Sequence, residues 1–312
     1  MSMKVGIIGV GAVGTACAKT MLLRGSCQEM VLLDVKKRRV KGVAADLSHA
    51  GVLYPGTRIR VGDYEDLTDA AVIVITAGIN EQAGKAIDRR DKLGRLRLLP
   101  PNAKIYRNIV PRLARAAPRV PILIVTDPPD PLADVARRYT KTNPILSAGT
   151  FLDTLRFRLQ IALRLGCQPT SVDALVLGEH GTTQVYVWSS AQVGGAPVLE
   201  RAREQGWKTR HFQKQVEATV RHANIDIIKG TGASQHGIGV VTARIVEAIL
   251  RDEGLVIPIG VLQPEYGITL SLPAVLGRSG VSKVLPPSLS PEETKALAAS
   301  AAAIREALAS LG

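Results

Sequence analysis

The stretch VGIIGVGAVGTACAKTMLLR, residues 5–24, places three glycines between an apolar run and a segment with helical spacing. Val5–Val10 has the Val/Ile content of a buried strand, and the residues after Gly14 have the spacing of a helix. Gly9 permits a tight turn, Gly11 lets backbone N–H groups approach an anion, and Gly14 allows strand and helix to pack closely. The stretch therefore predicts a strand, a phosphate-binding turn and a helix in succession.

An acidic residue stands where a dinucleotide site needs one. Asp34 lies twenty residues beyond Gly14, at the end of the next apolar run, Met30–Asp34. Its carboxylate can accept hydrogen bonds from ribose hydroxyls and would repel a 2′-phosphate, which favours NAD over NADP. Against this, the basic residues Lys36–Arg39 follow at once and could contact such a phosphate. Glycines that only ease packing are the alternative, but the strand, helix and acid around them favour dinucleotide binding.

Short apolar runs alternate with helix-period segments through the first half of the chain. The further strands expected are Ile59–Val61, Ala71–Thr76, Ile122–Thr126 and Ile145–Ala148, and the helices are expected at residues 12–23, 38–49, 95–117 and 131–140. Continuous Val/Ile runs are typical of parallel strands that helices cover on both faces. We therefore predict an α/β fold with a Rossmann-type, doubly wound parallel sheet over residues 1–149.

The pattern changes after about residue 150. Helical spacing at 151–165, 211–229, 234–250 and 291–310 accompanies the hairpin-like segments TTQVYVWSS and QVGGAPV. This predicts a C-terminal mixed α+β domain over residues 150–312 that carries the substrate site. No flexible linker separates the halves, so we expect them to pack tightly, with the active site at their interface.

Composition narrows the possible partners. The net charge is +13, but basic residues are mixed with acidic ones along the chain and aromatic residues are only 4%. Single-strand nucleic-acid binders stack bases on aromatic rings, so we expect a small-molecule ligand rather than nucleic acid.

Cys17, Cys27 and Cys167 have no metal-ligand spacing and suggest neither a metal site nor a disulfide framework. The nearly uncharged N-terminal segment contains glycines and Lys19, so we predict no membrane span and a cytoplasmic location.

Two segments of the second half carry groups suited to acid–base chemistry. His180 follows an apolar strand in VLGEHG, and an imidazole at a strand end can act as a base, although a lone histidine is more often structural. Asp153 and Arg156 share one face of a helix in FLDTLRFRL and could form no more than a local salt bridge. A carboxylate can also fix the tautomer of an imidazole, and an arginine can grip a substrate carboxylate.

GVGAVG with Asp34, TAG (76–78), TDPPD (126–130), FLDTLRFR (151–158) and GEHG (178–181) together resemble the L-lactate/malate dehydrogenase family in order and spacing. The resemblance covers almost the whole chain. It implies an NAD-dependent oxidoreductase that interconverts an L-2-hydroxy acid and its 2-oxo acid, with lactate and pyruvate as the first substrates. The alternatives are malate and oxaloacetate, or a catalytically weak dinucleotide-binding relative. The family forms dimers and tetramers, so the resemblance also implies a homodimer or homotetramer.

The resemblance also implies a role for each matching residue. His180 would donate and accept the proton, with Asp153 orienting it. Arg156 would bind the substrate carboxylate, and Arg95 would polarise the reacting carbonyl. Ser234 falls where the substrate side-chain pocket closes. The residues implied for NAD are Gly9, Gly11, Val13, Gly14, Asp34, Thr76, Ala77, Gly78 and Ile238.

Asp127 departs from the family pattern. The family carries an asparagine after the fifth strand, whose amide donates to the substrate oxygen, whereas an ionised carboxylate can only accept. Asp127 could be protonated, could face His180 and favour the imidazolium, or could belong to a reorganised site.

The loop after TAG is the second departure. At the position where lactate enzymes read the substrate side chain with glutamine, and malate enzymes with arginine, this chain has Glu81. A glutamate would repel the second carboxylate of oxaloacetate, so pyruvate is favoured unless Arg89 or Arg90 reaches inward. Residues 79–94 also exceed the family's usual loop length. We predict a mobile lid with Arg95 at its far end, the alternative being a disordered surface insert.

Overall fold

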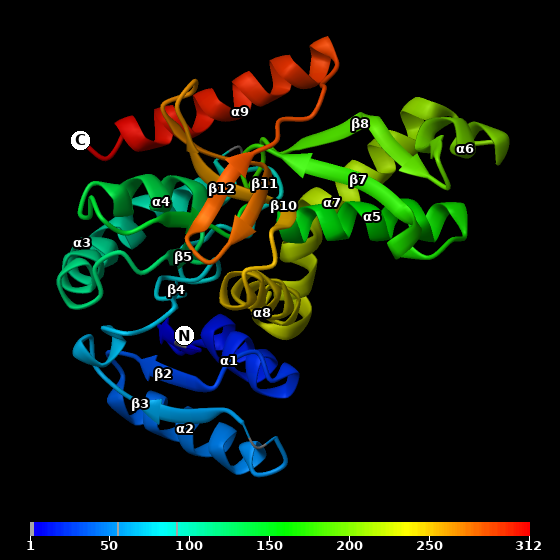
Figure 1. Ribbon diagram of the computed structural model, residues 1–312. Helices are drawn as coiled ribbons and strands as arrows, with labels where there is room; N and C mark the ends of the chain where they lie inside the picture. Colours follow the sequence, from blue (N-terminus) through cyan, green and yellow to red (C-terminus); the bar gives the residue numbers. More distant parts are fainter. Residues whose placement is uncertain (1–2, 55, 92) are drawn as a thin grey trace.

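A nine-stranded sheet forms the centre of the computed structural model, which describes residues 3–54, 56–91 and 93–312 (Figure 1). Six parallel strands follow the order β3–β2–β1–β4–β5–β6. They are β1 (Lys4–Ile8), β2 (Glu29–Leu33), β3 (Arg58–Val61), β4 (Val72–Ile75), β5 (Ile122–Ile124) and β6 (Ile145–Ser147). Each begins and ends within two residues of the sequence prediction. The doubly wound parallel sheet is therefore confirmed, and its strand order reverses between β1 and β4, where such sheets bind ligands.

Helices cover both faces of this sheet. They are α1 (Ala12–Arg24), α2 (Lys37–Gly51), α3 (Leu99–Ala116) and α4 (Pro129–Arg137), with short 3₁₀ turns η1 (Glu65–Leu67) and η2 (Gly94–Leu98). Successive side chains of one strand point to opposite faces. In β1, Ile7 packs in the cluster that contains α1 and α2, while Ile8 packs in the cluster that contains α3 and α4. The predicted helix at 95–117 is confirmed from Leu99 onward, but its first turn is 3₁₀.

The second half contains a separate three-stranded antiparallel sheet. It consists of β7 (Val172–Leu177), β8 (Val185–Val193) and β9 (Ala196–Pro197). The accompanying helices are α5 (Phe151–Leu165), α6 (Val198–Glu204), α7 (Thr209–Thr231), α8 (His236–Arg251) and α9 (Pro291–Ala309), with η3 at Pro169–Ser171. Phe157 and Trp188 meet edge to face at 4.7 Å in the core under this sheet. The predicted hairpin at QVGGAPV is the β8–β9 turn, whereas the short helix α6 was not predicted.

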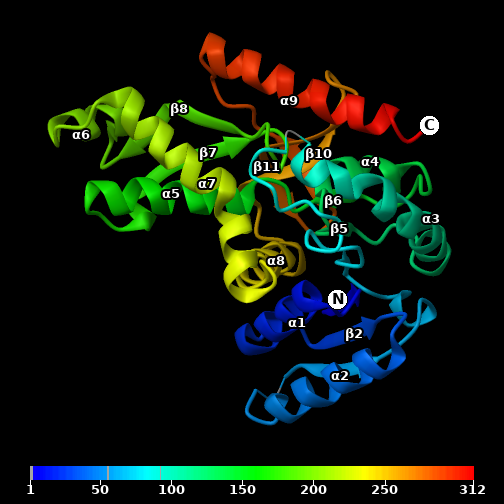
Figure 2. The same ribbon diagram turned by 180° about the vertical axis from the view of Figure 1, so that it is seen from behind.

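The large sheet continues from the first half into the second. Strands β10 (Leu255–Gln263), β11 (Ile268–Gly277) and β12 (Gly280–Val284) extend it beyond β6, and Gly260 of β10 pairs antiparallel with Ser147 of β6. The sequence patterns do not predict this extension. Helices α1 and α8 also meet closely (Figure 2), since a Cβ on Gly239 would lie 3.0 Å from the carbonyl carbon of Ala16. The halves therefore pack tightly, while a domain boundary at 149/150 stays a prediction.

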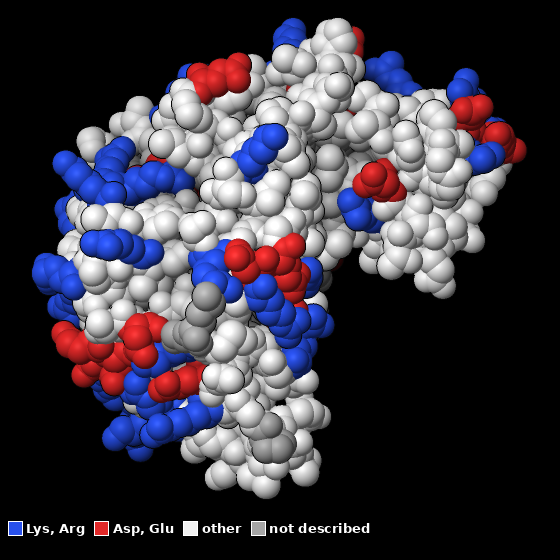
Figure 3. Space-filling view, viewed as in Figure 1, with Lys and Arg blue, Asp and Glu red and all other residues white. Residues whose placement is uncertain are grey.

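Surface charge is mixed in sign. On the face in Figure 3, Lys and Arg side chains lie among Asp and Glu rather than forming one unbroken basic surface. Within the described ranges, no helix combines the length and the apolar character needed to cross a bilayer. The chain has 40 basic and 27 acidic residues, and on the face shown the basic side chains are dispersed among the acidic ones.

Candidate active site

The glycine turn after β1 has the geometry expected of a phosphate-binding turn. Gly9 adopts φ +93°, and its N–H donates to the carbonyl of Leu33 at 2.8 Å. A Cβ on Gly14 would lie 2.0 Å from the carbonyl oxygen of Gly9, so α1 can approach the turn only with glycine there. A Cβ on Gly11 would meet nothing closer than a guanidinium nitrogen of Arg39 at 4.0 Å. The turn is thus tightly packed behind and open in front, which fits the pyrophosphate of a dinucleotide.

Asp34 lies directly beside this turn. Its carboxylate accepts hydrogen bonds from the backbone N–H of Val10 at 2.7 Å and of Lys36 at 2.8 Å. These bonds fix the carboxylate at the end of β2, next to the glycine turn. Of the basic cluster Lys36–Arg39, the structure places Arg39 in the lining of the neighbouring cleft. The acid and a candidate phosphate partner therefore both lie at this end of the cleft.

A cleft of about 830 Å³ runs from the glycine turn to His180, between the two halves. It is lined by eleven of the sequence-predicted residues: Gly11, Val13, Thr76, Gly78, Glu81, Arg95, Asp127, Arg156, His180, Ser234 and Ile238. Gly9, Gly14, Asp34, Ala77 and Asp153 are not among the residues that line it. Ala77 packs against Gly9, where its backbone nitrogen leaves no room for a Cβ, and Asp153 lies behind His180. The structure thus brings the predicted cofactor and substrate residues to one cleft.

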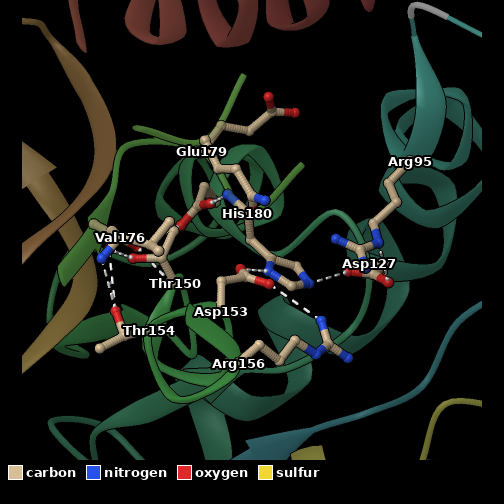
Figure 4. A network of polar contacts seen from close by, with 12 residues as sticks. Arg95, Asp127, Thr150, Asp153, Thr154, Arg156, Val176, Glu179 and His180 are labelled. Atoms are coloured by element: carbon tan, nitrogen blue, oxygen red, sulfur yellow. Dashed lines mark hydrogen bonds and ion pairs between the residues drawn. The ribbon is translucent and has the colours of Figure 1, made fainter. Parts of the chain in front are cut away.

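His180 is held from behind by a buried carboxylate (Figure 4). Its Nδ1 lies 2.5 Å from Oδ2 of Asp153, which projects from the first turn of α5. Arg156, one turn further along α5, donates from Nη1 to the other oxygen of Asp153 at 3.1 Å. Burial alone would raise the pKa of Asp153, but the charges of His180 and Arg156 and the bond to the imidazole outweigh it and hold the pKa below its usual value. An ionised Asp153 stabilises Nδ1–H, which leaves Nε2 as the ring nitrogen without a proton.

A second buried acid fixes the backbone of His180. The N–H of His180 donates to Oδ2 of Asp130 at 2.7 Å, and the hydroxyl of Ser147 donates to the other oxygen. Burial raises the pKa of Asp130 to about 6, against the opposing effect of these hydrogen bonds. Sequence reasoning singled out Asp127 in TDPPD and missed Asp130. The available signal was the second aspartate of that motif, six residues after β5 ends at Ile124.

Arg95 and Asp127 close the opposite side of the cleft from Asp153. Nε of buried Arg95 lies 3.4 Å from Oδ2 of Asp127, and Oδ1 of Asp127 lies 3.7 Å from Nε2 of His180 (Figure 4). Of the three arrangements considered for Asp127, the geometry therefore matches the one in which it faces His180. His180 lies between two carboxyl groups, one on each ring nitrogen.

Glu81 also reaches this group of charges. It lines the cleft together with Asp127, and the two acids are close enough for their charges to interact. Burial, reinforced by the negative charge of Asp127, raises the pKa of Glu81 to about 7, although Arg95 opposes the shift. Arg89 forms an ion pair with Asp226 of α7, and Arg90 pairs with Asp88. Neither arginine lines the cleft, so neither offsets the charge of Glu81 there.

Ser234 and Ile238 lie where α8 begins. Nη2 of Arg156 donates to the hydroxyl of Ser234 at 3.5 Å, which connects α5 with the segment before α8. Ile238 belongs to the first turn of α8 and packs partly against the core behind the glycine turn. Both residues line the same cleft as His180.

The long loop is packed against the body of the protein on several sides. A Cβ on Gly84 would lie 2.0 Å from Leu98, Ala86 is buried, and Arg89 reaches Asp226 on α7. Lys92 of the predicted lid lies outside the described residues. The described part of the loop thus connects the cleft wall at Glu81 with α7, and its mobility stays a prediction.

Comparison with known proteins agrees with this geometry. The family profile described as the lactate/malate dehydrogenase NAD binding domain matches residues 3–145, and that of the alpha/beta C-terminal domain matches residues 150–311. The chain therefore belongs to the lactate/malate dehydrogenase family, and its first half is an NAD-binding domain.

Individual relatives resemble the chain over nearly its full length. It is 41% identical to an L-lactate dehydrogenase of Deinococcus radiodurans, over 97% of each chain, and 39% identical to one of Chloroherpeton thalassium, over 99% of this chain and 100% of that one. Among solved structures, a lactate dehydrogenase from a Medee basin deep-sea metagenome library superposes with a TM-score of 0.90 at 32% identity, covering 99% of each chain. Predicted family and fold class are confirmed.

Proposed function

We propose that this protein interconverts pyruvate and L-lactate with NAD as its cofactor. The observation that carries the proposal is the placement of His180, backed by Asp153, in one cleft with Arg156, Arg95 and the glycine turn. The L-lactate dehydrogenases to which the chain is similar support the same substrate. This complete set of polar groups argues against a catalytically weak relative.

The residues of the cleft divide the chemistry between them. Asp153 accepts the Nδ1–H of His180, so Nε2 can take the hydroxyl proton of lactate and, in the reverse direction, return a proton to the carbonyl oxygen of pyruvate. Arg156 binds the substrate carboxylate, and buried Arg95 stabilises negative charge on the reacting oxygen. NAD, when bound, accepts the hydride from the substrate carbon or supplies it.

The cofactor would extend along the glycine turn. Gly9, Gly11 and Gly14, with the N-terminus of α1, would hold the pyrophosphate, and Asp34 would accept from the ribose hydroxyls. The remaining residues proposed to contact NAD are Val13, Thr76, Ala77, Gly78 and Ile238. The open space at Gly11 and the cleft beside it support this placement.

Pyruvate is favoured over oxaloacetate as the substrate. Glu81 stands in the cleft without an arginine from the loop beside it, since Arg89 and Arg90 pair elsewhere. We expect kcat/KM for pyruvate to exceed that for oxaloacetate when NADH oxidation is followed with each acid in turn. A higher kcat/KM for oxaloacetate would contradict the proposal, and no turnover of any 2-oxo acid would contradict the activity itself.

The purified protein should prefer NADH to NADPH because the fixed carboxylate of Asp34 would repel a 2′-phosphate. Like charges brought together in a binding site cost several kcal/mol, so Asp34→Ser should narrow the preference by at least about tenfold. Asp34→Asn keeps an oxygen that can accept from Val10 N–H and separates the loss of charge from disturbance of the turn. The measurement is kcat/KM for each cofactor at saturating pyruvate. Equal use of NADPH by the unmutated protein would refute the role of Asp34.

We further propose a homodimer or homotetramer in the cytoplasm. Leu155, Leu159 and Leu163 lie on one face of α5 and are 39%, 41% and 65% exposed, as side chains at a subunit contact would be in a single chain.

Residues 79–94 are proposed to act as a lid, and the ion pair between Arg89 and Asp226 of α7 would hold this lid closed. Shortening such a lid would lower kcat as well as raise KM.

A further inference from the structure

Glu81 and Asp127 place two carboxyl groups against each other in the wall of the substrate cleft. The family resemblance predicts an amide or arginine at the first position and an amide at the second, so a pair of acids departs from the family pattern at both positions. Both residues line the cleft together with His180, Arg95 and Arg156.

The fold holds the two acids together through their backbones. Glu81 follows β4 and Asp127 follows β5, and these strands are parallel neighbours whose ends meet at one edge of the sheet. A Cβ on Gly78 would lie 2.3 Å from the methyl group of Thr126, so only glycine allows the two segments to pack this closely. Buried Asn102 accepts from the N–H of Ile79 at 2.7 Å and donates to the carbonyl of Asp127 at 2.7 Å. A single amide therefore ties both acid-bearing segments in place.

A hydrogen bond between two carboxyl groups requires a proton. Ionised carboxylates only accept, so Glu81 and Asp127 can share a hydrogen bond only when one of them carries a proton. Burial and the charge of Asp127 raise the pKa of Glu81 to about 7, so Glu81 takes up a proton as the pH falls through neutrality.

The cations around the pair are already engaged. Arg95 lies against Asp127, and Arg156 is bonded to Asp153. Two further titratable groups belong to this region: His180, which faces Asp127, and its neighbour Glu179, which is buried. Among the ion pairs of the described residues, none involves Glu81. An ionised Glu81 therefore lacks a cation of its own, and a proton or a cation from the substrate can fill that place.

We propose that Glu81 and Asp127 form a proton-sharing pair that selects substrates by side-chain charge. With its proton the pair accepts a 2-oxo acid with an uncharged side chain, and without the proton it accepts one with a cationic side chain. The cleft would then have a further substrate class, 2-oxo acids that carry a guanidinium or ammonium group. This inference rests on the proposed 2-oxo acid reductase activity.

The pH dependence has a definite sign. Below pH 7 Glu81 is mostly protonated and the uncharged side chain of pyruvate fits; as pH rises through 7 the pair gains a negative charge, which opposes anionic groups and attracts cationic ones. If pyruvate binds both forms of the pair and the cationic acid binds only the ionised form, the ratio of kcat/KM for the cationic acid to that for pyruvate rises up to tenfold per pH unit below pH 7. If oxaloacetate binds only the protonated form, the ratio for oxaloacetate over pyruvate falls above pH 7.

The experiment measures kcat/KM with NADH from pH 6 to 9 for oxaloacetate, pyruvate and 5-guanidino-2-oxopentanoate, whose side chains carry a negative, no and a positive charge. Using ratios between substrates at each pH cancels the protonation of His180, which all three reductions share. Glu81→Gln keeps the size of the side chain and removes its titration. Glu204→Gln on α6, whose carboxylate is exposed and pairs with Arg201, is the control for removing one negative charge elsewhere.

The expected result is a rising guanidino-to-pyruvate ratio and a falling oxaloacetate-to-pyruvate ratio in the unmutated protein and in Glu204→Gln, with both ratios flat in Glu81→Gln. Ratios that do not change with pH in the unmutated protein would overturn the proposal, as would equal slopes in Glu81→Gln. Turnover of none of the three acids would instead refute the activity on which it rests. Circular dichroism and NADH binding of Glu81→Gln show whether that variant is folded.

Discussion

His180→Gln lowers kcat for pyruvate reduction by roughly 10²- to 10⁴-fold, the usual contribution of a positioned general acid. Glutamine can still donate a hydrogen bond toward the cleft, but it cannot transfer a proton at neutral pH. The buried Asp153 keeps its ion pair with Arg156 at 3.1 Å, so the charge behind position 180 is not left alone. The loss should therefore appear in kcat rather than in folding.

Binding measurements separate this effect from general damage. The glycine turn lies at the other end of the cleft, so the Kd for NADH in His180→Gln should stay within a few-fold of its original value. His222→Gln is the matched control and should leave kcat unchanged, because His222 is a half-buried histidine on α7 whose Nδ1 contacts the carbonyl of Ala218 on the same helix. A His180→Gln variant that retains more than a tenth of the original kcat would show that the proton comes from elsewhere.

Arg156→Lys lowers kcat/KM for pyruvate by about 30-fold to several thousand-fold. Lysine keeps the positive charge but loses the planar pair of donors that matches a carboxylate, so the exchange is not conservative at a bidentate site. Weakening a buried, hydrogen-bonded charge pair costs about 2–5 kcal/mol, and each 1.4 kcal/mol is a factor of ten. Most of the loss should appear as a higher KM, because Arg156 is proposed to bind the substrate carboxylate in the ground state as well.

A second arginine on the same helix provides the control. Arg158 lies two residues further along α5 and donates to the carbonyl of Ala174 and to Asp173, away from the cleft. Arg158→Lys should leave both KM and kcat nearly unchanged. If Arg156→Lys also has an unchanged KM for pyruvate, the substrate carboxylate binds elsewhere, and Arg156 serves only to hold Asp153.

The parallel half of the sheet could be predicted because its strands are continuous runs of Val and Ile. In β4, Val72–Ile75, all four residues are buried. A continuous apolar run of this kind is typical of a parallel strand that helices cover on both faces. Strands β10–β12 were harder, because a hairpin at the C-terminal side can pair with any free edge. Their attachment to β6 depends on Gly260 meeting Ser147, a contact over more than a hundred residues that local patterns do not contain.

The same distinction holds in the site. The pairing of His180 with Asp153 was predicted from the resemblance to the family, and the structure places Nδ1 of His180 2.5 Å from Oδ2 of Asp153. The contact between Glu81 and Asp127 was not predicted. It depends on the path of a long loop and on the amide of Asn102, which bonds to the segments of both acids. The sequence shows which residues are charged, whereas the side chain that each of them contacts can be identified only from the folded structure.

The continuous sheet has a consequence for the history of such a chain. The two family profiles meet between residues 145 and 150, yet this point lies at the middle of the sheet, where β6 has β5 on one side and β10 on the other. An ancestral first half on its own would have presented the bare edge of β6, and exposed edges invite aggregation. The two segments match separate family profiles, but each covers a sheet edge of the other. Replacing either segment with that of a relative would therefore require a strand edge that pairs with the remaining half.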